Sequence, residues 1–225
     1  MPRQRRLILP GVAAHIIQRG NNRADCFRCD GDYLVYLSLL KELSARMDCA
    51  LHAYCLMTNH VHMLMTPTSA KACSALMQNL GQRYVQYFNR RHARTSTLWE
   101  GRFLSSVVGS PEYVMACHRY IELNPVRAFM VSTPGAYRWS SHLGNVGLDD
   151  DCLLAAHPDY RSIGGHAAYA QLFADELPAT MISNIREAVV GGYPLGDDAF
   201  KASLDISPVR MQRGKAGRPP RHAAG

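Results

Sequence analysis

Apolar positions in the first fifty residues follow two different periods. Residues 12–18 form a short β-branched run that ends at a Gly-Asn-Asn cluster at 20–22, which predicts a strand followed by a turn. Over residues 31–47, leucines recur at spacings of three and four, which is the period of an amphipathic helix. Asp30 is the predicted N-cap of that helix.

The next stretch of the chain predicts a hairpin, a second helix and a further strand. The apolar runs at 51–57 and 60–65 are separated by two polar residues, which suits a tight hairpin with both strands largely buried. Residues 69–91 carry apolar side chains on one side at helical spacing and end in a cluster of arginines. Residues 102–108 predict another strand.

The third predicted helix has clear start and stop signals. Ser110 suits the N-cap, Pro111 the first helical position and Glu112 the first turn. Pro125 disfavours the helical conformation for the residue before it, so the helix is expected to end at about Asn124.

The order strand, helix, strand, strand, helix, strand, helix predicts an α+β fold with a ferredoxin-like antiparallel sheet and helices on one face. The domain that contains this sheet and its helices is expected to span residues 1–145. Residues 146–206 are acidic, helical in pattern and broken by glycines, so they predict a small accessory segment. Residues 207–225 form a basic tail that cannot build a core and is predicted to be disordered.

Charge and composition narrow the classes of function. The formal net charge is +7, and all but four of the 25 cations are arginines, which favours a polyanionic partner. No apolar run is long enough to span a membrane, and no signal peptide precedes the first strand, so a cytoplasmic location is expected. Seven scattered cysteines form no disulfide framework. Cys26 and Cys29 have CxxC spacing without a second pair, which favours two half-buried residues over a metal or redox site.

Two histidines stand out on the second hairpin strand. The two-residue period of a strand places His60 and His62 on one face, about 7 Å apart at the backbone. A pair of this kind can converge on one metal ion, whereas a single buried histidine is more often a hydrogen-bonded core residue. Five other histidines have no partner at useful spacing and receive no role: His15, His52, His92, His118 and His142.

Tyr120 and Asn124 are four residues apart on the third predicted helix, so their side chains lie on one face about 6 Å apart. An amide oxygen is a hard ligand and could complete a two-histidine site for Mg²⁺ or Mn²⁺. A phenol is a poor nucleophile at neutral pH and needs such a cation to polarise a phosphodiester. The helical position alone is equally compatible with an amphipathic core tyrosine.

Five motifs together resemble the REP-associated tyrosine transposases, which belong to the single-tyrosine HUH transposase superfamily. The resemblance covers about residues 8 to 145. Its motifs are RGNNR at 19–23, MTNHVHMLM at 57–65, LWEGRF at 98–103, RYIELNPVRA at 119–128 and YRWSS at 137–141. HxH alone is a weak signal, whereas the five motifs in this order are specific. Phe129 and Met130 depart from the family's more usual Gly-Leu.

The resemblance implies a role for each residue of the constellation. His60 and His62 would be metal ligands, Asn124 the third ligand and Tyr120 the nucleophile. The implied reaction is cleavage and rejoining of single-stranded DNA with Mg²⁺ or Mn²⁺, in which Tyr120 takes the 5′ phosphate and releases a 3′ hydroxyl. The implied substrates are hairpin-forming repetitive palindromes or insertion-sequence ends.

Other residues compete for these roles. Tyr113 lies almost on the same helix face as Tyr120 but about 10 Å away along the axis, so it is expected in the core. Glu100 and Glu122 could act as acid or base, although Glu100 could instead pair with Arg102.

Several arginines are candidates for phosphate contacts, and three aromatic residues for base stacking. A solvated helix face and an apolar core would also explain these residues. Arg218 lies in a Gly-Arg-Pro sequence that resembles an AT-hook, although a solubilising tail is an alternative. The other candidates are Arg19, Arg23, Arg83, Arg90, Arg91, Arg94 and Arg102 for phosphates, and Tyr84, Tyr87 and Trp99 for stacking.

Two rival functions remain open at this level. A domesticated relative could bind hairpin DNA without cutting it, although such a protein has no need of His60, His62, Tyr120 and Asn124 together. A small phosphoesterase with paired HxT motifs is disfavoured because the sequence has one HxH and no HxT. A monomer and a homodimer are both compatible with the sequence.

Overall fold

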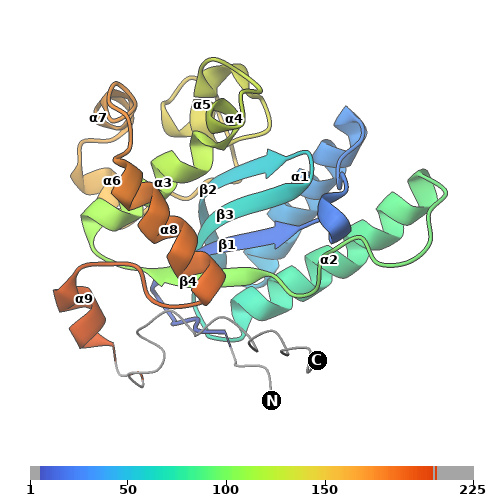
Figure 1. Ribbon diagram of the computed structural model, residues 1–225, viewed down its shortest axis with the longest axis horizontal. Helices are drawn as coiled ribbons and strands as arrows, with labels where there is room; N and C mark the ends of the chain where they lie inside the picture. Colours follow the sequence, from blue (N-terminus) through green and yellow to red (C-terminus); the bar gives the residue numbers. More distant parts are fainter. Residues whose placement is uncertain (1–5, 205, 207–225) are drawn as a thin grey trace, which may run out of the picture.

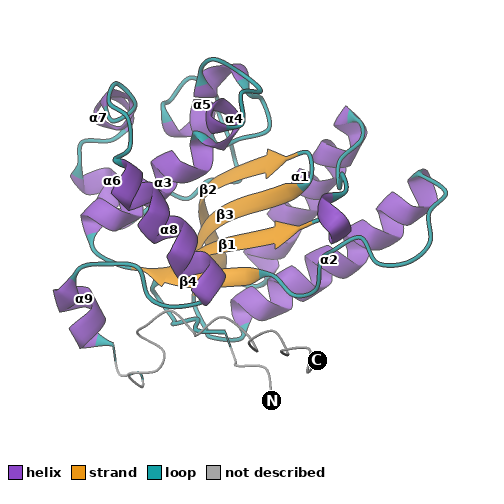
Figure 2. Cartoon of the chain, viewed as in Figure 1, coloured by secondary structure: helices purple, strands orange, loops and turns teal. Residues whose placement is uncertain are grey.

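The structure is a computed structural model that describes residues 6–204 and 206. A four-stranded sheet forms its centre, and helices pack around it (Figures 1 and 2). The elements of the sheet unit are β1 (Ala13–Arg19), η1 (Asn21–Arg23), α1 (Asp30–Arg46), β2 (Cys49–Met57), β3 (His60–Pro67), α2 (Ala72–Arg91), β4 (Leu104–Val108) and α3 (Pro111–Glu122). They are followed by α4 (Asn124–Arg127), η2 (Pro134–Ala136), α5 (His142–Asn145), α6 (Pro158–Ser162), α7 (His166–Gln171), α8 (Ala179–Gly191) and α9 (Asp198–Ser203).

The strands lie in the order β2-β3-β1-β4, and every neighbouring pair is antiparallel. The predicted order of strands and helices and the α+β class are therefore confirmed. The register sets Ile17 of β1 and Cys55 of β2 on either side of His62 in β3. His62, the second histidine of the predicted metal-binding pair, thus lies on a central strand with a neighbouring strand on each side.

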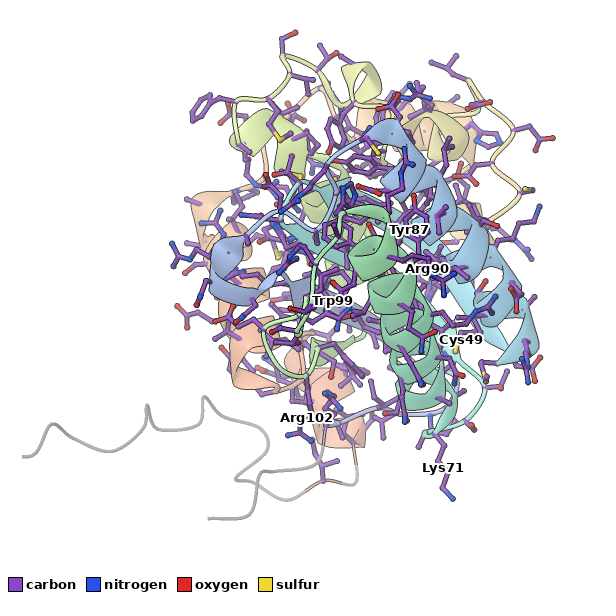
Figure 3. All side chains as sticks on the ribbon, turned by 90° about the vertical axis from the view of Figure 1, so that its right-hand side faces the viewer. Cys49, Lys71, Tyr87, Arg90, Trp99 and Arg102 are labelled. Atoms are coloured by element: carbon purple, nitrogen blue, oxygen red, sulfur yellow. The ribbon has the colours of Figure 1, made fainter. Side chains whose placement is uncertain are left out.

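The helices form two layers, one on each face of the sheet. α1 and α2 pack together on one face, and α8 lies on the other, as Figures 1 and 3 show from two directions. α3 shares the face of α8, because its Tyr120 ring contacts the ring of His62. The expectation of helices on one face describes α1 and α2 only. The face that α3 covers is the one toward which His60 and His62 point.

Two helix termini differ in detail from the predictions. α1 begins at Asp30 with Cys29 as its N-cap, and the carboxylate of Asp32 accepts hydrogen bonds from the backbone N–H groups of Arg28 and Cys29. The predicted cap, Asp30, is instead the first residue of the helix, because Asp32 supplies the capping carboxylate at the third position.

The third helix begins as predicted, with Ser110 at the N-cap and Pro111 next to it. It ends at Glu122, and α4 begins at Asn124 after a single helical residue. Pro125 therefore does not push Asn124 out of the helical region; it occupies the first turn of α4, where a missing N–H costs nothing. Asn124 consequently keeps its i, i+4 relation to Tyr120.

Residues after 146 add the short helices α6 to α9, which pack against the sheet unit. Leu195 bridges to Val108 of β4, and Ile185, Ala188 and Val189 of α8 are buried. The predicted basic tail, 207–225, lies outside the described residues. None of the helices in the described part of the chain is long and apolar enough to cross a membrane.

Candidate active site

A cavity of about 370 Å³ opens between strands β1 and β3 and helices α3, α4 and α8. It collects side chains from segments far apart in the sequence. Among the described residues that line it, three are arginines and none carries a carboxylate, so the cavity is suited to an anion. Its lining consists of Ile17, Arg19, Met57, His60, His62, Tyr120, Asn124, Arg127, Ala128, Arg186, Val189 and Val190. The four residues singled out in the sequence lie together in this cavity.

His60 is held by its neighbour in the hairpin turn. Its Nδ1 lies 2.7 Å from the Oδ1 of Asn59, which can only accept, so Nδ1 carries the proton and donates. Burial and then the nearby Arg19 lower the pKa of His60 to about 4, so the ring is neutral at pH 7. In the neutral ring the lone pair is therefore on Nε2, the atom that remains to bind a cation.

His62 is held from the adjacent strand. Its Nδ1 lies 3.0 Å from the Nε2 of His15, and the two rings stack with centroids 5.3 Å apart. Burial lowers the pKa of both groups, to about 3 for His15 and well below the ordinary value for His62. Nε2 of His62 is again the nitrogen left for a ligand, with its ring centroid 4.9 Å from that of His60.

Tyr120 closes the cavity from α3. Its ring meets the rings of His62 and His15 edge to face, at centroid distances of 5.8 and 5.7 Å. The guanidinium of Arg127 lies 4.2 Å from the centroid of the same ring, and its Nη2 donates to the carbonyl of Tyr120. The side chain is 4% exposed, so the phenol can be reached only through the cavity.

Asn124 is oriented by the end of α3. Its Nδ2 donates to the carbonyls of Tyr120 and Ile121, at 3.1 and 3.3 Å. The amide oxygen is therefore the group that Asn124 can offer to a ligand. Two neutral imidazoles and one amide oxygen, each with its other polar atom held by the protein, are a donor set that fits a divalent cation with open positions.

Arg127 and His15 are site residues that sequence reasoning missed. Arg127 is partly buried, and its buried Nε and Nη1 have no hydrogen-bond partner among the described residues. Buried donors without a partner favour an anionic ligand. The available signal was the position of Arg127, seven residues after Tyr120 and so on the same side of a continuous helical path. His15 gave no local signal, because its partner lies 47 residues away on the next strand.

Comparison with protein families decides the family to which the chain belongs. The model of the IS200-like transposases matches residues 9–124, which hold β1 to α3 together with Asn124. The chain belongs to the IS200-like transposase family. No curated protein matches the sequence of this chain at a significant level.

One solved structure agrees with this assignment at the level of the fold. A REP-associated tyrosine transposase bound to a REP hairpin superposes with a TM-score of 0.56 at 16% identity, over 71% of this chain and 93% of that one. A putative transposase from Deinococcus radiodurans covers 58% of this chain and 92% of its own, at 18% identity and a TM-score of 0.38. The resemblance read from the sequence motifs is thus confirmed as a family and a fold.

The candidate phosphate-binding arginines of the transposase do not form one patch. Arg19 lines the cavity, and the carbonyl of Arg23 accepts a hydrogen bond from Asn59, the residue that holds His60. Arg83 instead pairs with Glu42 on α1 at 2.5 Å. Three further candidates are exposed or partly exposed at the end of α2 and before β4: Arg90, Arg91 and Arg94. Arg218 lies outside the described residues.

Arg102 and two of the stacking candidates, Tyr87 and Trp99, lie on the side of the molecule that Figure 3 faces. Figure 3 shows Tyr87, Arg90, Trp99 and Arg102 along α2 and the loop that follows it. Arg102 is exposed and lines a second cavity of about 390 Å³ together with Trp99, whose side chain is 7% exposed. Tyr84 cannot stack on a base, because it is fully buried and its hydroxyl donates to the carbonyl of Cys26.

All seven cysteines are free, Cys26 and Cys29 among them. Cys26 is buried, and its thiol donates to the carbonyl of Thr58. Cys29 lies with Asp32 and His92 in a group whose ligand atoms are within 4.8 Å of one another. The Asp32 carboxylate already accepts from Nε2 of His92 at 2.9 Å and from two backbone N–H groups, which accounts for this group without an ion.

Glu122 does not line the cavity of Tyr120, and its side chain is buried elsewhere. Its carboxylate is fully buried on the side of α3 that meets the C-terminal part of the chain. There it accepts hydrogen bonds from Ser141, His142, Asn145 and Tyr169. Tyr113 is partly buried against the core and Glu100 is exposed, and neither lines the cavity of Tyr120.

Proposed function

We propose that this transposase cuts and rejoins single-stranded DNA through a covalent bond between Tyr120 and the 5′ phosphate of the cut strand. The observation that carries the proposal is the shared cavity of Tyr120, His60, His62 and Asn124, lined by three arginines and by no carboxylate among the described residues. An enclosed phenol beside neutral imidazoles and unpaired cationic donors is the combination that attack on a phosphodiester requires.

The chemical step exchanges one phosphodiester for another. Oη of Tyr120 loses its proton and bonds to phosphorus, the bond from phosphorus to the 3′ oxygen breaks, and that oxygen leaves as a hydroxyl after taking up a proton. No water is consumed and no nucleotide is needed, because the bond energy is kept in the phosphotyrosine. A 3′ hydroxyl can later attack the phosphotyrosine, which restores Tyr120 and joins the strands.

His60, His62 and Asn124 would hold a divalent cation, Mg²⁺ or Mn²⁺, at the cavity wall. Bound there, the cation would polarise the phosphodiester and stabilise the charge that develops on the departing oxygen. Asn59 and His15 keep the two imidazoles oriented, and the backbone carbonyls of α3 do the same for the amide of Asn124. Arg127 adds positive charge beside the phenol ring.

We propose hairpin-forming repetitive DNA, of the REP kind, as the substrate. Two observations support this choice: the motifs of the sequence resemble those of REP-associated transposases, and a protein of that kind with the same fold was solved with a REP hairpin bound. The cluster of arginines at the end of α2 would contact phosphates of the duplex stem. We propose that such a protein acts on DNA in the cytoplasm.

The test is a search for a covalent adduct. The purified full chain is mixed with hairpin-bearing single-stranded DNA taken from beside its own gene, with Mn²⁺ or Mg²⁺, and run on a denaturing gel. We expect a protein–DNA band that resists denaturant and is lost with a chelator. Tyr120→Phe should abolish the band while hairpin affinity stays nearly unchanged, and His60→Ala should reduce it strongly.

Two controls separate this enzyme from a binding protein. Tyr113→Phe removes a phenol from the same helix outside the cavity and should leave the adduct intact. Tight hairpin binding without any adduct would favour a domesticated DNA-binding protein that does not cut. An adduct that persists in Tyr120→Phe would show that another residue is the nucleophile.

A further inference from the structure

The chain leaves α4 through an aromatic residue in an unusual position. Phe129 is 95% exposed, and Met130 after it is 42% exposed. The N–H of Phe129 donates to the carbonyl of Val126, and the N–H of Met130 donates to the carbonyl of Pro125, both at 2.9 Å. These two hydrogen bonds define a Schellman motif, in which Phe129 occupies the left-handed position just past the helix.

That position is unfavourable for phenylalanine in two ways. Its φ of 55° is in the left-handed region, where a Cβ atom clashes with the backbone and glycine is the usual residue. Its ring also remains in water, so the fold gains no burial in return. Neither the backbone nor the packing of the described chain accounts for an aromatic side chain at this position. The ring is therefore available for a contact with another molecule.

The position is next to the candidate active site. Ala128, the residue before Phe129, forms part of the cavity wall. Across the cavity, α8 contributes Val190, which is 69% exposed, and Arg186, which is also exposed. The rim thus offers apolar surface and positive charge together, with no carboxylate among the described lining residues.

We propose that Phe129 is a stacking platform for an unpaired base of the DNA strand, next to the phosphate that Tyr120 attacks. This inference rests on the proposed function, because it requires single-stranded DNA in the cavity. A nucleobase has a flat apolar face for the ring, and its phosphate carries the charge that Arg127 and Arg186 complement. A protein partner with an apolar surface would fit Phe129 and Val190. It would not fit the basic cavity beside them, which has three arginines and no carboxylate among its described lining residues.

The test uses a fluorescent base as its probe. A hairpin oligonucleotide with a single-stranded extension carries 2-aminopurine, moved base by base along the extension, and its fluorescence is quenched where it stacks on a ring. With the full chain, we expect quenching at one position. Phe129→Gly should abolish that quenching and weaken binding of the extended hairpin about tenfold, within the range for loss of one base stack. Binding of the hairpin without its extension should not change.

Controls keep this result separate from unfolding and from the nicking activity. Glycine suits the left-handed backbone, so Phe129→Gly should melt at the same temperature as the wild type or higher. Phe129→Trp should retain the quenching, and Leu34→Ala, which removes an exposed apolar residue from α1, should have no effect. Unchanged quenching and affinity in Phe129→Gly would overturn the proposal even if the wild type forms the Tyr120 adduct.

Two other outcomes have distinct meanings. If Phe129→Gly converts a dimer into a monomer in sedimentation, and base quenching is unchanged, then the ring packs against a second copy and the stacking proposal is wrong. If the wild type forms no adduct, the nicking function fails, but position-specific quenching that depends on Phe129 would still support the stacking subsite.

Discussion

Nε2 of His15 and Nδ1 of His62 lie 3.0 Å apart, so one hydrogen bond joins two neighbouring strands directly behind the candidate metal ligands. For His62 to present the lone pair of Nε2 to the cavity, its Nδ1 must carry the proton and donate to His15. His15 then holds its own proton on Nδ1, which is buried and has no partner in the described part of the chain. The hydrogen bond therefore fixes the tautomer in which Nε2 of His62 can bind a cation. In return, the buried N–H of His15 has no hydrogen-bond partner among the described residues.

The first prediction concerns this pair. His15→Ala should lower the affinity for Mn²⁺ by about 10- to 100-fold, as loss of a hydrogen-bonding partner behind a ligating histidine does in other metal sites. Calorimetric titration of the full chain with Mn²⁺ measures the effect. His15→Gln should recover part of the affinity, because its amide oxygen can reach the place of Nε2.

His52→Ala is the matched control, because His52 is also a buried, hydrogen-bonded histidine of the sheet but bonds to Ala155 and Thr66. It should leave the Mn²⁺ affinity unchanged. Equal affinities in wild type and His15→Ala would mean that His62 does not ligate, or does so without help from His15.

From the sequence we predicted the site residues whose placement follows from the period of a single strand or helix. We missed the contact that depends on which residues of two strands lie opposite each other. His60 and His62 follow from the two-residue period of one strand, and Tyr120 and Asn124 follow from the helical period of one helix. The contact between His15 and His62 depends on which residues of β1 and β3 lie opposite each other, and no local pattern specifies that register. The second helical layer was missed for a related reason, because its position depends on tertiary packing.

Arg127 was missed although its motif was noted, because its role depends on burial. Its guanidinium lies over the Tyr120 ring with two donor nitrogens unpaired among the described residues, an arrangement that a sequence cannot distinguish from an exposed arginine. Burial lowers its pKa, but an arginine remains charged at neutral pH. The buried charge is thus available to a phosphate in the cavity.

The second prediction follows from that charge. Arg127→Met, which keeps most of the packing volume, should slow adduct formation with hairpin DNA by about 100-fold in single-turnover experiments, because one preorganised donor to the transition state is lost. Arg127→Lys should recover little, since lysine lacks the planar fork. Arg161→Met, an exposed arginine on α6, should react at the wild-type rate. A normal rate in Arg127→Met would exclude Arg127 from the chemical step.

The third prediction concerns the buried carboxylate behind the tyrosine helix. Glu122 accepts four hydrogen bonds from side chains of residues 141–169 and so attaches α3 to the later part of the chain. Glu122→Gln places an NH₂ group opposite donors, and we expect the free energy of unfolding to fall by about 3 kcal/mol. Urea denaturation measures it, with Glu112→Gln on the exposed side of the same helix as the control.

A double-mutant cycle sharpens this test. If Glu122 acts through the network, the losses in Glu122→Gln and Tyr169→Phe should not add, because both variants break the bond between Glu122 and Tyr169. A Glu122→Gln protein with wild-type stability but no adduct would instead indicate a direct role in the reaction.

The fourth prediction concerns the pH dependence of stability at the start of α1. Burial raises the pKa of Asp32, but hydrogen bonds from the backbone N–H of Arg28 and from His92 outweigh it, so the pKa is lowered. A carboxylate with a lowered folded pKa stabilises the protein fully above its unfolded pKa of about 3.9 and loses that effect as the pH falls through the folded value. Asp32→Asn should therefore reduce the free energy of unfolding at pH 7 by about 2 kcal/mol.

The difference between the wild type and Asp32→Asn should shrink as the pH falls below 4 and through the lowered folded pKa of Asp32, because Asp32 is then protonated as well. Urea unfolding at a series of pH values gives the difference curve. Asp30→Asn is the control, since Asp30 lies in the same helical turn but pairs with Arg138 at an exposed position, where an ion pair contributes little. A constant difference between wild type and Asp32→Asn across this pH range would show that Asp32 does not stabilise the fold through its charge.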